Sequence, residues 1–422
     1  MTWKLLRATA VIRLLIIVGS TAIGFRPACG ADESLTSDSP SAASANAKAV
    51  RSVGKPSKEL RARLKLTEFH QRCLDADGFP ILSSERVSPY AHLEACWIID
   101  HMLTRRPDIR AALAEQGIRL VIMAPDEFTT AVPEHSHLRP REYWDRRARG
   151  LGSTVEHPAV SCGEENLLCY RGDPYAAENI LIHEFAHTIH LQGLSKVDPA
   201  FDDRLRTVYE RALEAGKWTG KYAATNRAEY WAEGVQSWFG SNRENDSEHN
   251  HVNTRDELKE YDSDLADLLA SVFPDNDWQY RRPQDRSPED RRHLAGFDPD
   301  KAPAFQWPKE LVAAWERFQQ GTDLVSLSPL PQETAEQARS AESRKETSVR
   351  FRNQTESTVR LYWVDTDGNR KPYGSVQPGR DRDQHTFAGH VWLVTDSQNH
   401  PLTIFTADTE PGIALISGEP GR

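Results

Sequence analysis

The chain contains no long apolar run beyond its first thirty residues, no block of basic charge and no internal repeat. Without an apolar stretch of about 20 residues, its interior offers no membrane-spanning helix. The net charge is −10 and the basic residues are scattered among acidic ones, which argues against nucleic acid as the main partner. A hydrophobic content of 38% allows a sizeable core, and a length of 422 residues favours two domains.

The first thirty residues have the pattern of an export signal. Basic residues precede an apolar stretch at 14–25, and the small residues Ala28 and Gly30 form a signal-peptidase pattern. The apolar stretch is short for a membrane anchor. We therefore expect residues 1–30 to be a signal peptide, no stable membrane span after its removal, and a secreted or periplasmic protein.

Cysteine is scarce, with five residues in the whole chain. Removal of the signal peptide would take away Cys29 and leave an even set, which an oxidising compartment would pair. Three pairings are open from sequence alone. We expect the two local ones, Cys73 with Cys96 and Cys162 with Cys169.

Changes in composition divide the chain into parts of different character. After the signal peptide we expect a disordered leader (31–57), a mainly helical domain (58–320), a linker (321–346) and a small all-β sandwich (347–420). The fold class is therefore α+β. Apolar spacing predicts a buried strand over 120–124 and helices over 58–74, 91–103, 176–191, 227–239, 257–273 and 308–319.

The segment 180–190 contains the pattern His-Glu-x-x-His, at His183, Glu184 and His187. Positions i and i+4 share a helix face, so both imidazoles can bind one tetrahedral metal ion. Glu184 then stands beside the ion, where it can take a proton from bound water. The pattern predicts a zinc site, and a core helix with two incidental histidines is the plainer alternative.

A catalytic zinc site needs a third protein ligand and an open position for water. His190 lies about 10 Å along the helix from His183, too far for both to bind one ion, so we expect it to hydrogen-bond near the site or to pack. Glu229, on the downstream helix, is the better candidate. Glu233, one turn later, can accept the free N–H of a zinc-bound histidine.

Together the two segments resemble the gluzincin peptidases related to anthrax lethal factor. His183-Glu-x-x-His187 is followed by Tyr222, six residues, and then Glu229-Tyr-Trp-Ala-Glu233, as in that family's downstream motif. The resemblance covers two helices and the loop between them. It implies a zincin-like fold for the helical domain, Glu229 as third zinc ligand and Tyr222 as the phenol that stabilises the oxyanion.

The resulting expectation is an exported zinc peptidase that acts on extracellular polypeptide, with Glu184 as general base. Two alternatives stay open. One is a zinc hydrolase of cell-wall or glycan-linked amides, and the other is an extracellular adhesion or binding protein with a structural zinc ion. Glu184 and Tyr222 disfavour the second, because a structural site needs neither.

The C-terminal β-rich segment resembles the von Hippel–Lindau β-domain over most of residues 347–415, with Trp, Tyr, His and Trp in matching order. In that family the sandwich binds a hydroxyproline-containing peptide, and the resemblance implies such a partner here. Thr386 replaces a serine and keeps the hydroxyl, whereas Phe387 replaces a tyrosine and does not. The family's ligase-recruiting helical part has no counterpart. The matching pocket positions are Trp363, Tyr373, His385, Thr386, Phe387, His390 and Trp392.

Overall fold

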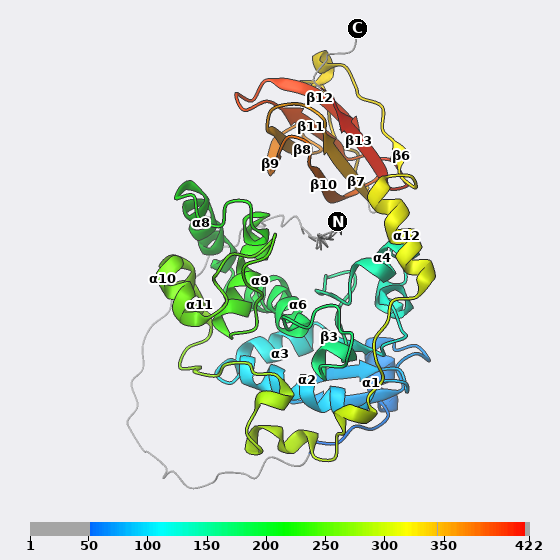
Figure 1. The fold of residues 1–422 in the computed structure, drawn as a ribbon, viewed down its shortest axis with the longest axis vertical. Helices are drawn as coiled ribbons and strands as arrows, with labels where there is room; N and C mark the ends of the chain where they lie inside the picture. The colour runs from blue at the N-terminus through cyan, green and yellow to red at the C-terminus, as the bar shows by residue number, and fades with distance from the viewer. Residues whose placement is uncertain (1–50, 344, 418–422) are drawn as a thin grey trace, which may run out of the picture.

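The computed structural model describes residues 51–343 and 345–417, in two successive parts. A helix-rich part is built around one mixed sheet, and a β-sandwich follows it (Figure 1), so the α+β class is confirmed. The expected signal peptide, and the expected leader up to residue 50, lie outside the described residues. In the rest of that leader, Gly54 exchanges two backbone hydrogen bonds with Cys73, and Ser57 caps the first helix. Residues 51–57 are therefore part of the fold.

Helices make up most of the N-terminal part. They are α1 (Lys58–Leu64), α2 (Pro89–Met102), α3 (Pro107–Glu115), α4 (Arg141–Arg147), α5 (Glu164–Leu167), α6 (Ile180–Thr188), α7 (Ser195–Val197), α8 (Phe201–Glu214), α9 (Arg227–Trp238), α10 (Arg255–Tyr261), α11 (Ser263–Val272) and α12 (Lys309–Gln320). None of these helices in the described part of the chain combines the length and apolarity needed to cross a bilayer.

Two expected helices are shorter than the sequence pattern indicated. The helix expected over 58–74 ends at Leu64, because Lys65 adopts a left-handed conformation with φ of 52°, and the chain then enters a strand. The helix expected over 257–273 is two helices, interrupted at Asp262 by extended backbone with φ of −141° and ψ of 75°.

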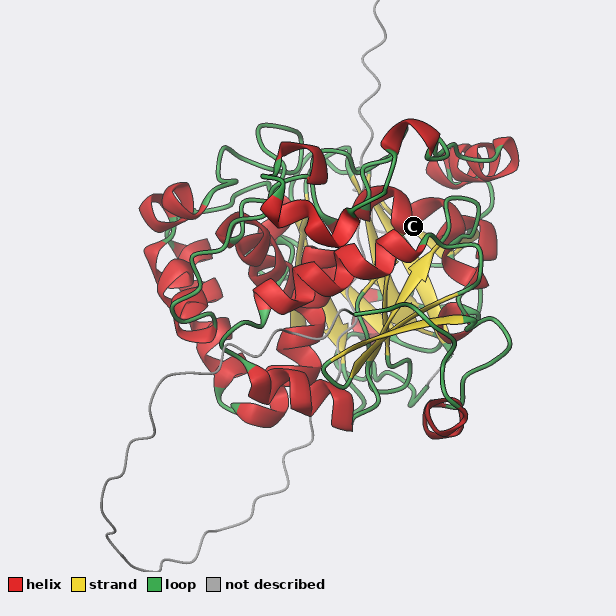
Figure 2. Ribbon diagram, turned by 90° about the horizontal axis from the view of Figure 1, so that it is seen from below, coloured by secondary structure: helices red, strands yellow, loops and turns green. Residues whose placement is uncertain are grey.

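The central sheet has the strand order β1-β2-β3-β5-β4, in which β2, β3 and β5 are parallel and both edge strands are antiparallel. Every residue of β2, β3 and β5 is buried, as expected for strands covered on both faces. Helices lie across this sheet (Figure 2). The strands are β1 (Arg72–Ala76), β2 (Phe79–Ser83), β3 (Arg119–Met123), β4 (Gly150–Leu151) and β5 (Ala159–Gly163).

The sandwich consists of two four-stranded sheets, ordered β10-β7-β13-β6 and β12-β11-β8-β9. Its core includes the enclosed rings of Phe351, Trp392 and Phe405. The strands are β6 (Val325–Ser326), β7 (Glu346–Asn353), β8 (Val359–Val364), β9 (Arg370–Val376), β10 (Asp381–Phe387), β11 (Val391–Thr395), β12 (Pro401–Thr406) and β13 (Gly412–Ile416).

The segment expected as a linker, 321–346, packs on the sandwich along its described residues. Strand β6 pairs with β13, and Leu330 bridges to Ile404. Leu327 and Ala335 are buried in the hydrophobic clusters of the sandwich. Widely spaced apolar residues are enough to hold this stretch against the sheets, although they give no periodic pattern in the sequence.

Helix α12 joins the two parts of the molecule. Its Phe318 packs with Tyr143 and Trp144 of α4. From β7, the buried guanidinium of Arg350 donates to the carbonyl oxygens of Phe318 and Gln319 at 2.5 and 3.1 Å. The sandwich is thereby hydrogen-bonded to the end of α12, and α12 to the body of the N-terminal part.

The predicted disulfides are wrong, since Cys73, Cys96, Cys162 and Cys169 are free thiols. Cys73 packs with Leu82, whereas Cys96 lies in the large core on the other face of the sheet, so their side chains point apart. Cys162 is fully enclosed on β5, and Cys169 lies beyond α5. Burial raises the pKa of Cys73, Cys96 and Cys169 to about 11, which keeps these thiols protonated at neutral pH.

Candidate metal centre

Helix α6 carries the His-Glu-x-x-His pattern through the middle of the protein. Asn179 caps its start by accepting a hydrogen bond from the Ile182 amide at 3.0 Å, and all its residues are buried. A π-helical turn, η3 (Ile189–Leu194), continues it. His183 and His187 are buried polar side chains on this helix, so they need polar partners on neighbouring elements. Helix α9 provides such a partner.

Helix α9 packs directly against α6. Asn226 caps it by accepting hydrogen bonds from the backbone amides of Ala228 and Glu229. This cap fixes the first turn of the helix, from which the Glu229 side chain projects. The indole of Trp231 donates to the carbonyl oxygen of Ala186 at 2.8 Å. This hydrogen bond clamps the two helices together with Glu229 facing the histidines.

The side chains of His183, His187 and Glu229 meet in one buried group. Nε2 of His183 lies 3.2 Å from Nε2 of His187 and 3.2 Å from Oε2 of Glu229. Nε2 of His187 lies 3.3 Å from the same Glu229 oxygen. Ligands about 2.0–2.1 Å from a tetrahedral metal ion are separated by about 3.3 Å. The three atoms therefore already have the spacing of three corners of a metal-binding tetrahedron.

The chemistry of this group fits a cation. Glu229 is only 1% exposed, and its enclosed Oε1 has no hydrogen-bond partner among the described residues. Burial raises the pKa of the Glu229 carboxyl, and the adjacent His187 and His183 more than offset this, so its pKa is held below the ordinary range. Two imidazole nitrogens and a carboxylate at contact distance form a donor set that a metal ion satisfies.

A second layer of polar side chains orients His183. Its Nδ1 lies 2.7 Å from Oε1 of Gln236 and 3.5 Å from Oε1 of Glu233. The predicted partner Glu233 is thus near His183, but its other oxygen faces His249 at 3.1 Å. Gln236 was missed by the sequence reasoning. Its spacing of seven residues from Glu229, on the same face of α9, is the signal that could have found it.

His190 faces away from the metal-binding group. Its Nε2 lies 3.0 Å from Oδ1 of Asp202 on α8, and Asp202 also pairs with Arg227 at the start of α9. The ring packs edge-on against Phe201. As expected from its spacing, His190 is not part of the His-His-Glu group, and it instead links α8 to the α6–α9 pair.

Tyr222 lies in a 3-10 turn, η4 (Tyr222–Ala224), just before α9. The centroid of its ring is 6.5 Å from that of His183, and the side chain is 8% exposed. The structure therefore brings Tyr222 beside the metal-binding group, while its role in stabilising an oxyanion stays a prediction.

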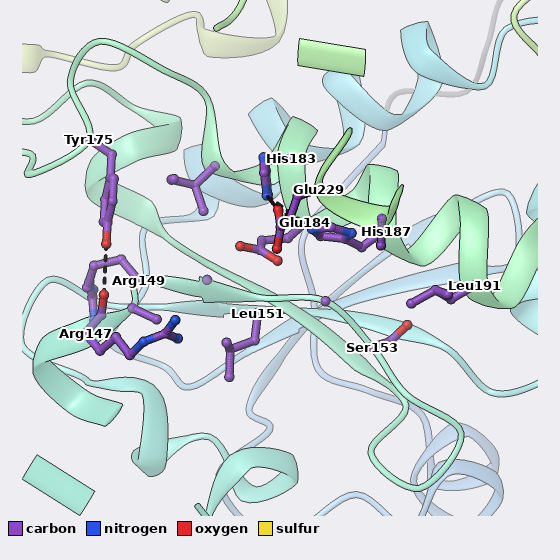
Figure 3. Close-up of a pocket in the computed structure, with 15 residues that line it drawn as sticks. Arg147, Arg149, Leu151, Ser153, Tyr175, His183, Glu184, His187, Leu191 and Glu229 are labelled. Carbon is purple, nitrogen blue, oxygen red and sulfur yellow. Dashed lines mark hydrogen bonds and ion pairs between the residues drawn. The ribbon is translucent and has the colours of Figure 1, made fainter. Parts of the chain in front are cut away.

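A pocket opens over the metal-binding group, between α6, α9 and the edge strand β4. Figure 3 shows Arg147 and Tyr175 at one end, His183, Glu184 and Glu229 further along, and Leu191 at the other end. The full lining is Arg147, Ala148, Arg149, Gly150, Leu151, Gly152, Ser153, Tyr175, Ile180, His183, Glu184, His187, Leu191, Ala228 and Glu229.

Glycine lets β4 approach α6 closely. A Cβ atom on Gly150 would lie 2.5 Å from Cγ2 of Ile180 and 2.8 Å from the Ser161 carbonyl oxygen, and one on Gly152 would lie 3.1 Å from Cβ of His187. Only residues without a side chain fit this approach. The sequence pattern did not predict that residues 147–153 form one wall of the pocket, and the local signal for it is the single Gly-x-Gly at Gly150 and Gly152.

The C-terminal sandwich has a match among known families. Residues 338–409 match the family model of the VHL beta domain. The match confirms the resemblance noted for this segment and begins within the segment expected as a linker. It does not extend to the metal-binding part.

Within the VHL beta domain, the seven predicted pocket positions cluster but differ in exposure. Trp392 and Thr386 are enclosed, and the indole N–H of Trp392 donates to Oγ1 of Thr386 at 3.0 Å. The ring of Trp363 stacks on His390 with centroids 5.1 Å apart, and Phe387 lies 5.2 Å from His390. The Trp363, His390 and Phe387 rings are half-buried.

The remaining two positions flank this cluster. The ring of His385 is edge-on to Phe387, and Tyr373 is edge-on to the buried Trp392, with centroids 5.4 and 4.9 Å apart. Burial, then the neighbouring His385, lower the pKa of His390 to about 4. His390 is therefore neutral at physiological pH, and Trp392 belongs to the core rather than to an open surface.

Proposed function

We propose that this protein is a zinc-dependent peptidase. The observation that carries the proposal is the His183, His187 and Glu229 group at tetrahedral spacing beneath a pocket that Glu184 also lines. Among the described residues no fourth ligand atom joins the group, which leaves a position for water as a catalytic site requires. Two nitrogen ligands and one carboxylate are a common catalytic zinc set, which supports zinc as the metal.

The residues present can then divide the hydrolysis among them. A zinc ion held by the three ligands supplies a Lewis acid, which polarises a carbonyl group and makes nearby water more acidic. Glu184 takes a proton from the water that attacks the scissile carbonyl carbon, and it delivers the proton to the amine nitrogen as the C–N bond breaks. The phenol of Tyr222 donates a hydrogen bond to the developing oxyanion.

An extended polypeptide suits the shape of the site. In the described part of the chain β4 is an edge strand paired with β5, and its residues Gly150 and Leu151 line the pocket. An edge strand binds extended peptide by adding it as a further strand, with the peptide backbone as the common feature. This favours peptide bonds over other amides, such as those of cell-wall or glycan-linked material.

The test uses the full chain with zinc, incubated with a mixture of unfolded proteins and analysed by mass spectrometry for new termini. We expect cleavage by the wild type and loss of cleavage of at least about 100-fold in Glu184→Gln, because general-base catalysis is worth about 10²–10⁴-fold. His190→Asn is the matched control, since His190 is buried on the same helix extension but faces Asp202. Unreduced cleavage in Glu184→Gln would remove the proposal.

For the VHL beta domain we propose binding of a hydroxyproline-bearing peptide, as an extracellular docking partner for the peptidase. The half-buried rings of Trp363, Phe387 and His390 can hold a pyrrolidine ring, and the neutral imidazole of His390 can hydrogen-bond to its hydroxyl. Thr386 is held by Trp392 and steadies His390, whose Nδ1 is 3.2 Å from the threonine hydroxyl.

Two peptides that differ only in the presence of one prolyl hydroxyl group test this binding. Their affinities are measured for the full chain with Glu184→Gln, which should not cleave them. We expect the hydroxylated peptide to bind at least about 10-fold more tightly, since a hydrogen-bonding site rejects analogues without the hydroxyl. Phe387→Tyr should strengthen that preference and His390→Phe should remove it. Equal affinity for both peptides in the wild type would contradict this part of the proposal.

We also propose export, on the pattern of residues 1–30 alone. Expression of the full chain in a bacterial host, followed by fractionation and mass spectrometry of the N-terminus, tests it. The expected product begins at Ala31 and lies outside the cytoplasm. An intact N-terminus in the cytoplasmic fraction would contradict export.

A further inference from the structure

Arg147, at the C-terminal end of α4, lines one end of the pocket (Figure 3). The residue is only 4% exposed. Its guanidinium lies over the rings of Trp144 and Tyr143, at 5.3 and 5.8 Å from their centroids. The side chain of this pocket-lining residue is therefore held in place by two aromatic rings of α4.

Among the described residues, the guanidinium of Arg147 has no carboxylate as a partner. Its Nε is enclosed and has no hydrogen-bond partner, and within the described part of the chain no carboxylate forms an ion pair with it. Its polar neighbour is the Tyr143 phenol, whose pKa burial raises to about 12, against the opposing effect of Arg147. A neutral phenol does not balance a guanidinium charge.

Arg149, two residues further on, shows the contrasting arrangement. Its Nε and Nη2 bind both oxygens of Glu165 at 2.6 and 3.0 Å, and its guanidinium also donates to the carbonyl oxygens of Glu127 and Ala124. Arg149 is thus fully paired inside the protein. The same loop therefore contains one buried arginine with a built-in carboxylate and one, Arg147, without.

Burying a guanidinium without a counter-charge is costly, and a carboxylate that forms two parallel hydrogen bonds with it is the best compensation. Arginine is the residue best suited to such planar recognition. The end of the pocket at Arg147 is accordingly a site for a carboxylate from outside the protein, next to a cleft that already suits extended peptide.

We propose that Arg147 binds a carboxylate group of the substrate and so makes the protein selective for peptides that place an acidic group at this end of the pocket. The proposal rests on the proposed peptidase function for its meaning, although the carboxylate site itself does not depend on catalysis. The carboxylate can come from an Asp or Glu side chain or from the C-terminus of the peptide.

Binding to the uncleaving Glu184→Gln full chain separates the site from the reaction. The probes are hexa-alanine amides that carry one Glu at each position in turn, the same set with Gln, and hexa-alanine with a free C-terminal carboxylate. Isothermal titration calorimetry measures each dissociation constant. We expect one probe with a carboxylate to bind about 10- to 100-fold more tightly than its neutral counterpart, as for a charged hydrogen bond.

Arg147→Gln should remove this preference and leave binding of the neutral probes nearly unchanged. Arg146→Gln is the matched control, with the same change of charge one residue away, because Arg146 lies over Trp307 and Trp315 and not in the pocket lining. If Arg147→Gln fails to fold, Arg147→Lys keeps the charge and should weaken the preference by losing the paired hydrogen bonds.

A preference confined to one Glu position assigns the carboxylate to a side chain, and a preference for the free carboxylate assigns it to the peptide's C-terminus. Equal binding of the charged and neutral probes in every register, or a preference that persists in Arg147→Gln, would overturn the proposal. Selective binding without any cleavage by the zinc-loaded wild type would uphold the carboxylate site while removing the peptidase function.

Discussion

The N-terminal part, with its candidate metal site, and the VHL beta domain present their candidate functional side chains in opposite ways. His183, Glu184, His187 and Glu229 are each less than a tenth exposed, and helix packing sets their spacing. On the sandwich, by contrast, the rings of Trp363 and its neighbours are half-buried at a surface. The first site is fixed by the core of the protein, whereas the second depends on a few side chains resting on a stable scaffold.

Acid should distinguish the two parts most strongly. Burial lowers the pKa of His92 and of His135 to about 4, and both lie in the N-terminal part. Between pH 6.5 and pH 4 both histidines are protonated in the unfolded chain but neutral in the folded protein. The stability they contribute is complete above about pH 7 and is lost as the pH falls from 6.5 toward 4, at roughly 2 kcal/mol each by pH 5.

His390 of the sandwich has a similarly lowered pKa but is half-buried, so solvent weakens its effect. Limited proteolysis at rising temperature, with fragments identified by mass spectrometry, should find that the N-terminal part opens first at pH 5. His135→Gln should reduce its sensitivity to acid. An N-terminal part with the same melting temperature at pH 7.5 and pH 5 would contradict this contrast.

Adding one methyl group should harm the metal-binding part more than the sandwich. In Gly150→Ala the new Cβ would meet Ile180 and the backbone of Ser161, which cannot move easily, so we expect a loss of about 1–3 kcal/mol in unfolding free energy. In Gly412→Ala the three nearest atoms all belong to the side chain of Leu327 and none to the backbone, so we expect a smaller loss.

Gly54→Ala provides the baseline for these two variants, because its Cβ would have no atom of the described residues within 4 Å apart from its chain neighbours. Chemical denaturation measures all three, and metal affinity should fall in Gly150→Ala alone. A larger loss for Gly412→Ala than for Gly150→Ala would reverse the comparison.

The side chains that contact His183 from behind should affect metal affinity even though they are not themselves part of the His-His-Glu group. Gln236→Leu removes the hydrogen-bond partner 2.7 Å from Nδ1 of His183, and metal affinity should fall about 10- to 100-fold in competition with a chelator. Glu233→Gln should have a smaller effect, because its oxygen is 3.5 Å from the same nitrogen. Unchanged affinity in Gln236→Leu would mean that packing alone orients His183.

The smallest expected effect lies inside the sandwich. Thr386→Val removes the acceptor of the Trp392 indole N–H and should cost about 1 kcal/mol of sandwich stability, with metal affinity unchanged. Thr347→Val is the matched control and should be neutral or stabilising, since the enclosed Thr347 hydroxyl has no hydrogen-bond partner in the part of the chain that the structure describes. Thermal denaturation measures both variants. Equal losses of stability in the two would show that the hydroxyl of Thr386 has no special role.

The sequence could predict those features that depend on the spacing of apolar and turn residues close together in the chain. The helices around His183 and Glu229 follow from apolar periodicity, and the resemblance of the two motifs to a known family indicated the three side chains that meet in one buried group. The sandwich strands follow from alternation between turn residues. Each of these features needs only residues that are neighbours in the chain or on one helix face.

What the sequence could not predict depends on contacts between distant segments. Cys73 and Cys96 are close in the chain but lie on opposite faces of a sheet, so the pairing rule failed. Gln236 gains its importance only because α9 packs on α6. Arg147 and Arg149 look alike in sequence, and only the fold gives a carboxylate to one of them.

The central claim is that His183, His187 and Glu229 hold a zinc ion and that Glu184 uses it for hydrolysis. The most direct measurement is the zinc content of the purified full chain by mass spectrometry, beside peptide hydrolysis, for the wild type, Glu229→Ala and Glu184→Gln. We expect one zinc ion per wild-type chain, loss of zinc and activity in Glu229→Ala, and retained zinc without activity in Glu184→Gln. Undiminished zinc in Glu229→Ala, or full hydrolysis by Glu184→Gln, would contradict the account.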